Sequence, residues 1–249
     1  MTSELFSWPV ARATARERGL APVTLGIALV LVLIGMLRGS ADTWGAEAFS
    51  GFGAFWFFLL TLFLGGGLLA DEVESGHAQL VLLRPITRAQ WVGGRLAGAA
   101  LVLCLAGTAG WLSSILAALT RGASGELPAR LLVLPLALLP ALGWLATLAA
   151  IGAATRGWTN SGLLIAVRLA WSVAAFALPL AFPKLGLQPL IDVIGHHFGP
   201  QDAMMLARQV QYHERFAPSV AFWDLFWLFG AWLLAVRLFN LRELARRRA

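Results

Sequence analysis

The chain has 249 residues, of which 59% are hydrophobic and 13% are charged, and its mean hydropathy is +0.75. These values exclude an ordinary soluble domain, so we predict an all-α, polytopic membrane protein. The net charge of +6 would suit nucleic acid, but the basic residues form short clusters beside apolar segments, so membrane lipids with anionic head groups are the expected partner and nucleic acid is not.

The N-terminal segment, residues 3–19, is expected to form an amphipathic helix on the membrane surface. Trp8 and Val10 are apolar, and Arg12 and Arg16 are spaced four apart, which is the spacing of one helix face. A disordered tail is the alternative. The apolar stretch that follows is longer than the core of about 7 to 15 residues typical of a signal peptide, so we predict a retained helix.

Six apolar segments approach the length of about 20 residues that a helix needs to cross roughly 30 Å of hydrocarbon. We predict spans over residues 20–37, 48–70, 96–119, 131–154, 162–182 and 220–239, within one transmembrane domain covering residues 1–249. Pro135, Pro140 and Pro179 interrupt these segments and predict bends, which either a translocation pathway or packing alone can demand.

Arginine and lysine resist translocation, so their distribution predicts orientation. One side of the predicted membrane receives the smaller group, Arg38, Arg121, Arg130, Lys184, Arg208 and Arg215. The other receives the larger group, Arg12, Arg16, Arg18, Arg84, Arg88, Arg95, Arg156, Arg242, Arg246, Arg247 and Arg248. The larger group predicts that both termini are cytoplasmic, together with the polar loop over residues 71–90.

That loop has the pattern of a short helix between two breaks. Its acids follow a glycine run and cannot enter lipid at low cost. Residues 77–83 can form about two helical turns before Pro85 disfavours helical geometry at Arg84. Thr87 and Gln90 form a capping-box pattern that predicts the start of the third spanning helix near Ala89.

The sequence EVESGHAQLVLLRPITR in this loop resembles the signature of permease subunits of type-2 ATP-binding-cassette (ABC) exporters. That family includes the nitrous oxide reductase maturation permease. The signature reads approximately E-x-E-S-G-T-L-E-L-L-L-S-x-P-I-S-R, followed by G-K. The matching residues are Glu72, Glu74, Ser75, Gly76, Leu80, Leu82, Pro85, Ile86 and Arg88. His77 replaces the usual threonine and Arg95 the usual lysine.

The resemblance implies that the short helix is a coupling helix, which docks on a separate ATPase subunit. The implied docking residues are Glu72, Glu74, Ser75, Gly76, His77, Leu80, Leu83, Pro85 and Arg88. It also implies a homodimer of this chain in the bacterial inner membrane, exporting a substrate. The loop of some other transporter is the alternative.

The chain has no phosphate-binding loop, because its lysine, Lys184, follows no glycine-rich turn. We therefore expect no catalytic residue and no cofactor in this chain, and place ATP and Mg in the partner. Two other functions remain open: a membrane scaffold that transmits force to an extracytoplasmic partner, and a polytopic membrane enzyme.

Arg168 lies inside an apolar segment, where a central charge costs about 2.5 to 3.5 kcal/mol on insertion scales. It either extends its side chain to the inner interface or lines a pathway through the bundle. Asp224 and Arg237 are expected at the interfaces. Gly94 and Gly98 form a small-xxx-small pair that lets another backbone approach closely.

Residues 183–219 form a long extracytoplasmic loop in which the spacing of Leu187, Leu190, Ile191 and Ile194 predicts one or two short amphipathic helices. The loop also carries the copper-type ligands His196, His197, Met204, Met205 and His213. The same residues suit an amphipathic helix at the interface, and we expect no metal. Cys104, within an apolar run, has no disulfide partner in the chain. GASG at 122–125 does not predict a protease, because the histidines fall in loops.

Overall fold

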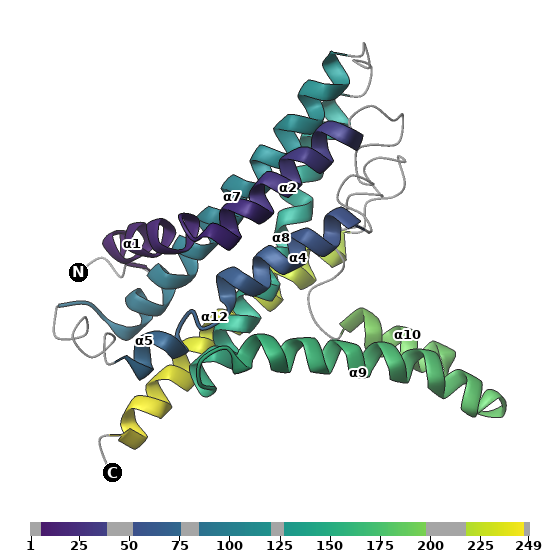
Figure 1. Cartoon of the computed structure of the whole chain (residues 1–249). Helices are drawn as coiled ribbons and strands as arrows, with labels where there is room; N and C mark the ends of the chain where they lie inside the picture. The colour runs from purple at the N-terminus through teal and green to yellow at the C-terminus, as the bar shows by residue number, and fades with distance from the viewer. Residues whose placement is uncertain (1–5, 39–51, 76–84, 121–126, 198–217, 247–249) are drawn as a thin grey trace.

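The structure is a computed structural model that describes residues 6–38, 52–75, 85–120, 127–197 and 218–246. Throughout this described part the regular elements are helices, and it contains no strand (Figure 1). The elements are α1 (Trp8–Gly19), α2 (Pro22–Arg38), α4 (Phe52–Gly65), α5 (Ala70–Glu74), α7 (Arg88–Leu119), α8 (Leu127–Ala154), α9 (Thr159–Ala181), η1 (Pro183–Leu185), α10 (Gln188–His197) and α12 (Pro218–Arg246).

Three described helical stretches are long and apolar enough to cross a membrane. They are Arg88–Ala117, Thr159–Ala181 and Ala221–Arg242. A fourth is added if α1 and α2, which meet at an angle of 74°, are taken as one broken span. This confirms the helical class and agrees with a membrane protein. The count of six spans stays a prediction.

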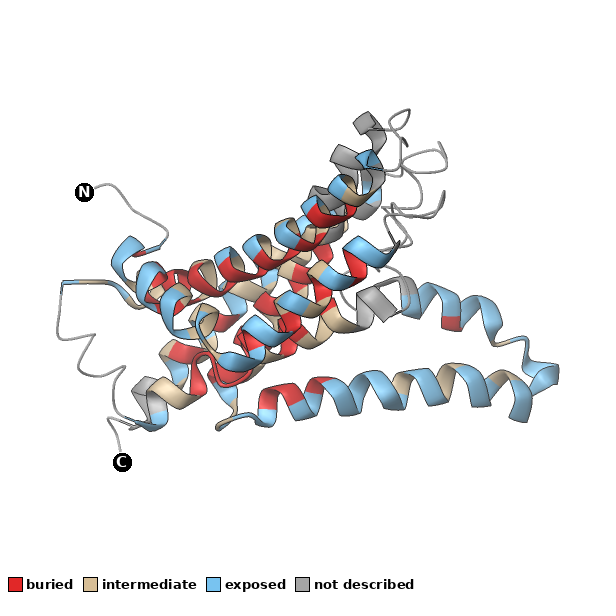
Figure 2. Cartoon of the chain, turned by 45° about the horizontal axis from the view of Figure 1, so that its top comes forward, coloured by how far each residue is buried: buried red, intermediate tan, exposed pale blue. Residues whose placement is uncertain are grey.

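Helix α7 is the centre of the bundle. It packs against α1 and α2 on one side and against α8 and α12 on the other, and it also contacts α4. The buried core follows these contacts, as the red stripes of Figure 2 show. Trp91 of α7 stacks on Phe239 of α12 with ring centroids 4.9 Å apart, and both side chains are fully enclosed. Leu60, Leu103 and Leu145 complete the contact between α4, α7 and α8.

Helix α9 leaves the bundle after its first turns. Asn160, Ser161 and Leu164 are buried, whereas the side chains beyond them are mostly exposed (Figure 2). Its exposed surface includes Val173, Phe176 and Leu180 and suits contact with hydrocarbon. Helix α10 follows η1 and confirms a short helix in the predicted 183–219 loop; residues 198–217 lie outside the described part.

The predicted span over residues 48–70 is wrong as a continuous helix. Helix α4 ends at Gly65, and the chain turns through Gly67, whose φ of +63° lies in the left-handed region that favours glycine. A new short helix, α5, then carries Asp71 and Glu72. The apolar pattern continues through Leu68 and Leu69 because both are buried in the turn, so hydropathy alone does not reveal the break.

Helix α7 begins at Arg88, earlier than the predicted span at residue 96. The capping box causes this start, as expected: the Thr87 amide donates to Gln90 Oε1 at 2.9 Å, and the Gln90 amide donates to Thr87 Oγ1 at 3.1 Å. The N-terminal helix also begins later than predicted, at Trp8; residues 3–5 lie outside the described part.

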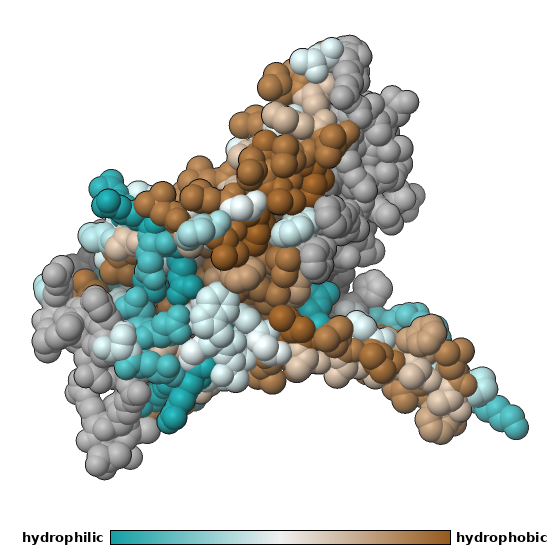
Figure 3. Space-filling view, in the orientation of Figure 1, coloured by the Kyte–Doolittle hydropathy of each residue, from teal (hydrophilic) through white to brown (hydrophobic). Residues whose placement is uncertain are grey.

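Both ends of the described chain lie at the same end of the bundle as α5 (Figure 1). The Ser7 amide donates to the Gln90 carbonyl at 3.0 Å, and Arg88 Nη1 donates to Asn240 Oδ1 at 3.4 Å, so residues near both termini meet the start of α7. Figure 3 shows hydrophilic side chains gathered over α1 and α5, with an apolar surface over α2 and α4. The end of the bundle that carries α1 and α5 is therefore polar.

Candidate functional site

The predicted docking residues divide between described and undescribed parts of the chain. Glu72 and Glu74 lie on α5, Ser75 follows it, and Pro85 precedes α7. Glu74, Ser75 and Pro85 are exposed, and the Ser75 hydroxyl donates to the Glu72 carbonyl at 3.3 Å. Gly76, His77, Leu80 and Leu83 lie outside the described residues. The structure thus fixes the two anchors of the segment over residues 76–84.

Arg95 of α7 is the centre of a buried polar network at this end. Its side chain is 6% exposed. Nη2 forms an ion pair with Glu72 Oε1 on α5 at 2.9 Å, and Nη1 pairs with Glu17 Oε2 on α1 at 2.9 Å. The remaining contacts are made by Nε, which donates to the Leu68 carbonyl at 3.3 Å, and by Nη1, which donates to Thr14 Oγ1 at 3.1 Å. One guanidinium therefore joins α1, α5 and α7.

A buried charge is tolerated only where it is paired and hydrogen-bonded. Arg95 is paired with Glu17 and Glu72, and Nε and Nη1 of its planar fork donate hydrogen bonds in different directions. A lysine ammonium is a point charge on a flexible stem and cannot reproduce this planar geometry. The positions of Thr14, Glu17 and Glu72 therefore suit an arginine at residue 95.

Arg18 makes a second link from α1 to the turn. Its Nη1 donates to the Gly66 carbonyl at 2.9 Å, and its Nη2 lies 3.7 Å from Asp71 Oδ2. Burial raises the pKa of the Asp71 carboxyl above its ordinary 3.8, and the Arg18 charge opposes that rise. The turn between α4 and α5 is thus held to α1 through its backbone as well as its acids.

Gly94 and Gly98 allow α1 to lie directly on α7. A Cβ atom on Gly94 would come within 2.8 Å of the Ser7 carbonyl oxygen, and one on Gly98 within 2.6 Å of Thr14 Cβ. The prediction of a close backbone approach is confirmed, and the approaching helix is α1. This contact brings Thr14 and Glu17 within reach of Arg95.

Asn160, at the start of α9, also forms hydrogen bonds with the turn between α4 and α5. Its Nδ2 donates to the carbonyls of Gly65 at 2.9 Å and Leu148 at 3.0 Å, and its Oδ1 accepts from the Gly67 amide at 3.3 Å. The Ser161 hydroxyl adds a bond to the Leu62 carbonyl at 3.2 Å. The bond to the Gly67 amide pairs a backbone donor of the turn, and the other bonds add side-chain donors to carbonyls of α4 and α8.

Arg168 of α9 turns back toward the bundle. Its guanidinium carbon lies 4.7 Å from the ring centroid of Trp144 on α8 and 5.3 Å from that of Phe58 on α4. Trp144 stands about 15 Å from the end of α8 at 1.5 Å per residue, so the charge lies over aromatic faces far from a helix end. Such contacts contribute about 0.5 to 2 kcal/mol.

Asp224 lies near the start of α12, and its interfacial placement stays a prediction. The side chain is completely buried on α12, and tertiary packing, not its position near a helix end, decides this. Among the copper-type ligands of the 183–219 segment, His196 and His197 end α10, while Met204, Met205 and His213 lie outside the described residues. Among the described residues, no group of three or more histidine, cysteine, aspartate or glutamate side chains is placed to hold a metal.

Sequence patterns do not single out Glu17, Arg18 or Asn160 as site residues, although these residues make many of the contacts described above. A usable signal existed for Asn160, which is a polar residue at the start of an apolar segment and next to Ser161. Glu17 offered none, since its partner is distant in sequence. No known family model matches the chain, and no curated protein matches it. The site must be interpreted from its own residues.

Proposed function

We propose that this chain is the transmembrane permease subunit of an ABC exporter, which couples ATP hydrolysis by separate ATPase subunits to substrate export across the inner membrane. The observation that carries the proposal is the segment from Glu72 to Arg88. Its residues match the permease signature, and both of its ends are fixed to the bundle.

The first end is fixed by the ion pair between Glu72 and Arg95, and the second by the capping box of Thr87 and Gln90. A force on residues 76–84 therefore acts on α5 and α7 together. Because a packed bundle transmits displacement through contacts that resist deformation, motion of α7 carries neighbouring helices with it. The segment serves as the lever on which an ATPase acts.

Two further contacts extend this lever across the bundle. Arg88, at the first position of α7, donates to Asn240 of α12, and Trp91 stacks on Phe239 of the same helix. On the other side, Gly94 and Gly98 seat α1. A stroke applied at the polar end thus reaches α1, α5, α7 and α12. In this proposal ATP and Mg bind in the partner, and two copies of this chain enclose the pathway.

The decisive experiment is affinity purification of the chain in mild detergent from its native membrane, with identification of any co-purifying ATPase that has a phosphate-binding loop. Glu74→Arg reverses an exposed charge on α5, and Gly76→Pro replaces a residue of the signature. Both variants should lose the ATPase. Asp192→Arg, a charge reversal on α10 at a distance from the segment, is the matched control and should retain it.

The folded state of each variant is checked by circular dichroism and by elution volume. Absence of an ATPase from the wild-type preparation, or an equal amount of ATPase with Glu74→Arg and Asp192→Arg, would contradict the proposal. Stimulation of ATP hydrolysis by the wild-type chain and not by Glu74→Arg would support it independently.

A further inference from the structure

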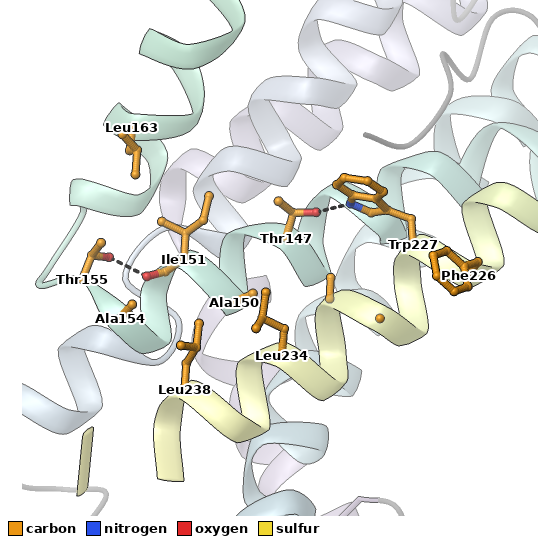
Figure 4. Close-up of a pocket in the computed structure, with 12 residues that line it drawn as sticks. Thr147, Ala150, Ile151, Ala154, Thr155, Leu163, Phe226, Trp227, Leu234 and Leu238 are labelled. Carbon is orange, nitrogen blue, oxygen red and sulfur yellow. Dashed lines mark hydrogen bonds between the residues drawn. The ribbon is translucent and has the colours of Figure 1, made fainter. Parts of the chain in front are cut away.

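An apolar groove of about 480 Å³ runs between α8, α9 and α12. Figure 4 shows Ala150 and Ile151 of α8 on one wall, with Leu234 and Leu238 of α12 on the other and Leu163 of α9 near its end. Gly230 of α12 also lines it, and a Cβ atom added there would meet nothing within 4 Å. The groove therefore lies between α8 and α12, two long helices that pack against each other.

The hydrogen-bonding groups that line the groove already have partners. The Thr147 hydroxyl donates to the Gly143 carbonyl at 2.8 Å and accepts from Trp227 Nε1 at 2.7 Å. The Thr155 hydroxyl donates to the Ile151 carbonyl at 2.9 Å (Figure 4). A polar ligand would lose its water and find no donor among these side chains, so the walls favour a hydrocarbon occupant.

The groove ends at a cationic residue. Arg242 lies one helical turn beyond Leu238 on α12, and its Nη1 donates to the carbonyls of Thr155 at 2.7 Å and Ala153 at 3.4 Å. The guanidinium is thereby held where α8 ends, and Arg156, which is exposed, follows directly. Apolar walls that end in two arginines complement an amphiphile with an anionic head and an apolar tail.

The dimensions fit one leaflet of a membrane. From Phe226 to Leu238 the groove extends about 18 Å along α12 at 1.5 Å per residue. Half of a hydrocarbon core of roughly 30 Å is about 15 Å. Helices α9 and α12 both contain stretches apolar enough to cross a membrane, so the groove between them opens toward hydrocarbon. Arg242 then lies at head-group depth.

We infer that this groove binds one acyl chain of an anionic phospholipid, with the lipid phosphate beside Arg242. The inference needs α9 and α12 to lie in a membrane, but it does not need an ATPase partner or transport. It therefore stands or fails separately from the permease function.

The test measures phospholipid retained by the purified chain after delipidation and return to nanodiscs containing equal amounts of phosphatidylglycerol and phosphatidylcholine. Gly230→Leu adds a side chain to the groove lining at a position where a Cβ atom meets nothing within 4 Å. Gly26→Leu is the matched control, since a Cβ atom at Gly26 also meets nothing within 4 Å and the residue is exposed on α2, away from the groove. Arg242→Gln removes the charge and keeps a hydrogen-bond donor.

Wild type and Gly26→Leu should retain phosphatidylglycerol, and Gly230→Leu should retain about tenfold less because at least two methylene contacts are displaced. Arg242→Gln should still bind lipid, but the ratio of retained phosphatidylglycerol to phosphatidylcholine should fall about fivefold. Equal retention by Gly230→Leu and Gly26→Leu would overturn the inference. Dissociation of a dimer by Gly230→Leu with unchanged lipid content would also overturn it and would assign the groove to a second copy of this chain.

Discussion

Arg95 on α7 and Glu72 on α5 form an ion pair with 2.9 Å between Nη2 and Oε1. Both side chains are largely enclosed, with exposed fractions of 6% and 18%. The pair fixes α5, on which the start of the signature segment lies, to the longest described helix of the bundle. The ion pair matters because of where it lies. It joins the proposed docking segment to α7, the helix that would move in the proposed function.

Arg95→Ala should lower the free energy of unfolding by about 3 kcal/mol, because it leaves the largely enclosed Glu72 carboxylate without its cation. Equilibrium unfolding in mixed detergent micelles measures this change. Arg16→Ala, at an exposed position on α1, is the control and should stay within about 0.5 kcal/mol of wild type. A double-mutant cycle with Glu72→Gln should give a coupling energy of about 1 kcal/mol or more. Additive effects would show that the two residues do not interact.

Gly98→Ala should destabilise the protein by about 1 to 3 kcal/mol, since the new methyl group would press on Thr14 Cβ and on the Ala11 carbonyl. Limited proteolysis should also cut within α1 sooner than in wild type. Gly162→Ala on α9 is the matched control, because a Cβ atom there meets nothing within 4 Å, and alanine stabilises an open helical position by up to about 1 kcal/mol. Equal stability of the two variants would contradict the close contact of α1 with α7.

Asn160→Ala should cost about 1 to 3 kcal/mol, because the buried Gly67 amide loses its acceptor and the Gly65 and Leu148 carbonyls lose a side-chain donor. Hydrogen exchange should then show faster exchange at the Gly67 amide than in wild type. Ser172→Ala serves for comparison: this exposed hydroxyl donates to the Arg168 carbonyl within the same helix, and its loss should change stability by less than about 0.5 kcal/mol. Unchanged protection at Gly67 would refute the role of Asn160.

Asp71→Asn tests the pH dependence of the turn. Burial raises the pKa of this carboxyl in the folded state above 3.8, so the folded state binds the proton more tightly than the unfolded state. The resulting stability is fully present below pH 3.8 and is lost as the pH rises through the folded pKa. Asp71→Asn abolishes this loss, so its thermal midpoint relative to wild type should increase between pH 3.5 and pH 7. A relative decrease would mean that the Arg18 ion pair outweighs burial.

Sequence patterns predicted structure correctly where the interactions behind them involve residues only a few positions apart. The Thr87 and Gln90 pattern predicts the start of α7 because both hydrogen bonds close within one helical turn. The spacing of Gly94 and Gly98 predicts a close helix contact for a similar reason, since both residues lie on one face. Neither pattern identifies α1 as the partner, because that depends on the bend of 74° between α1 and α2.

The break at Gly65 shows where hydropathy failed. Leu68 and Leu69 are as apolar as residues of a spanning helix, yet they are buried in a turn supported by Asn160 and Arg95, which lie far away in the chain. Whether a glycine run continues a helix or turns depends on partners for the freed backbone groups. Those partners exist only after folding.

By itself, the sequence determined the helical class, the apolar character that suits a membrane and the local starts of helices, because composition, periodicity and capping act over a few residues. The tertiary structure alone decided that Glu17, Glu72 and Arg95 meet, that Asp224 is buried and that an apolar groove remains beside α12. Each of these depends on how distant helices pack, since a buried charge or an open groove is defined by its neighbours in space.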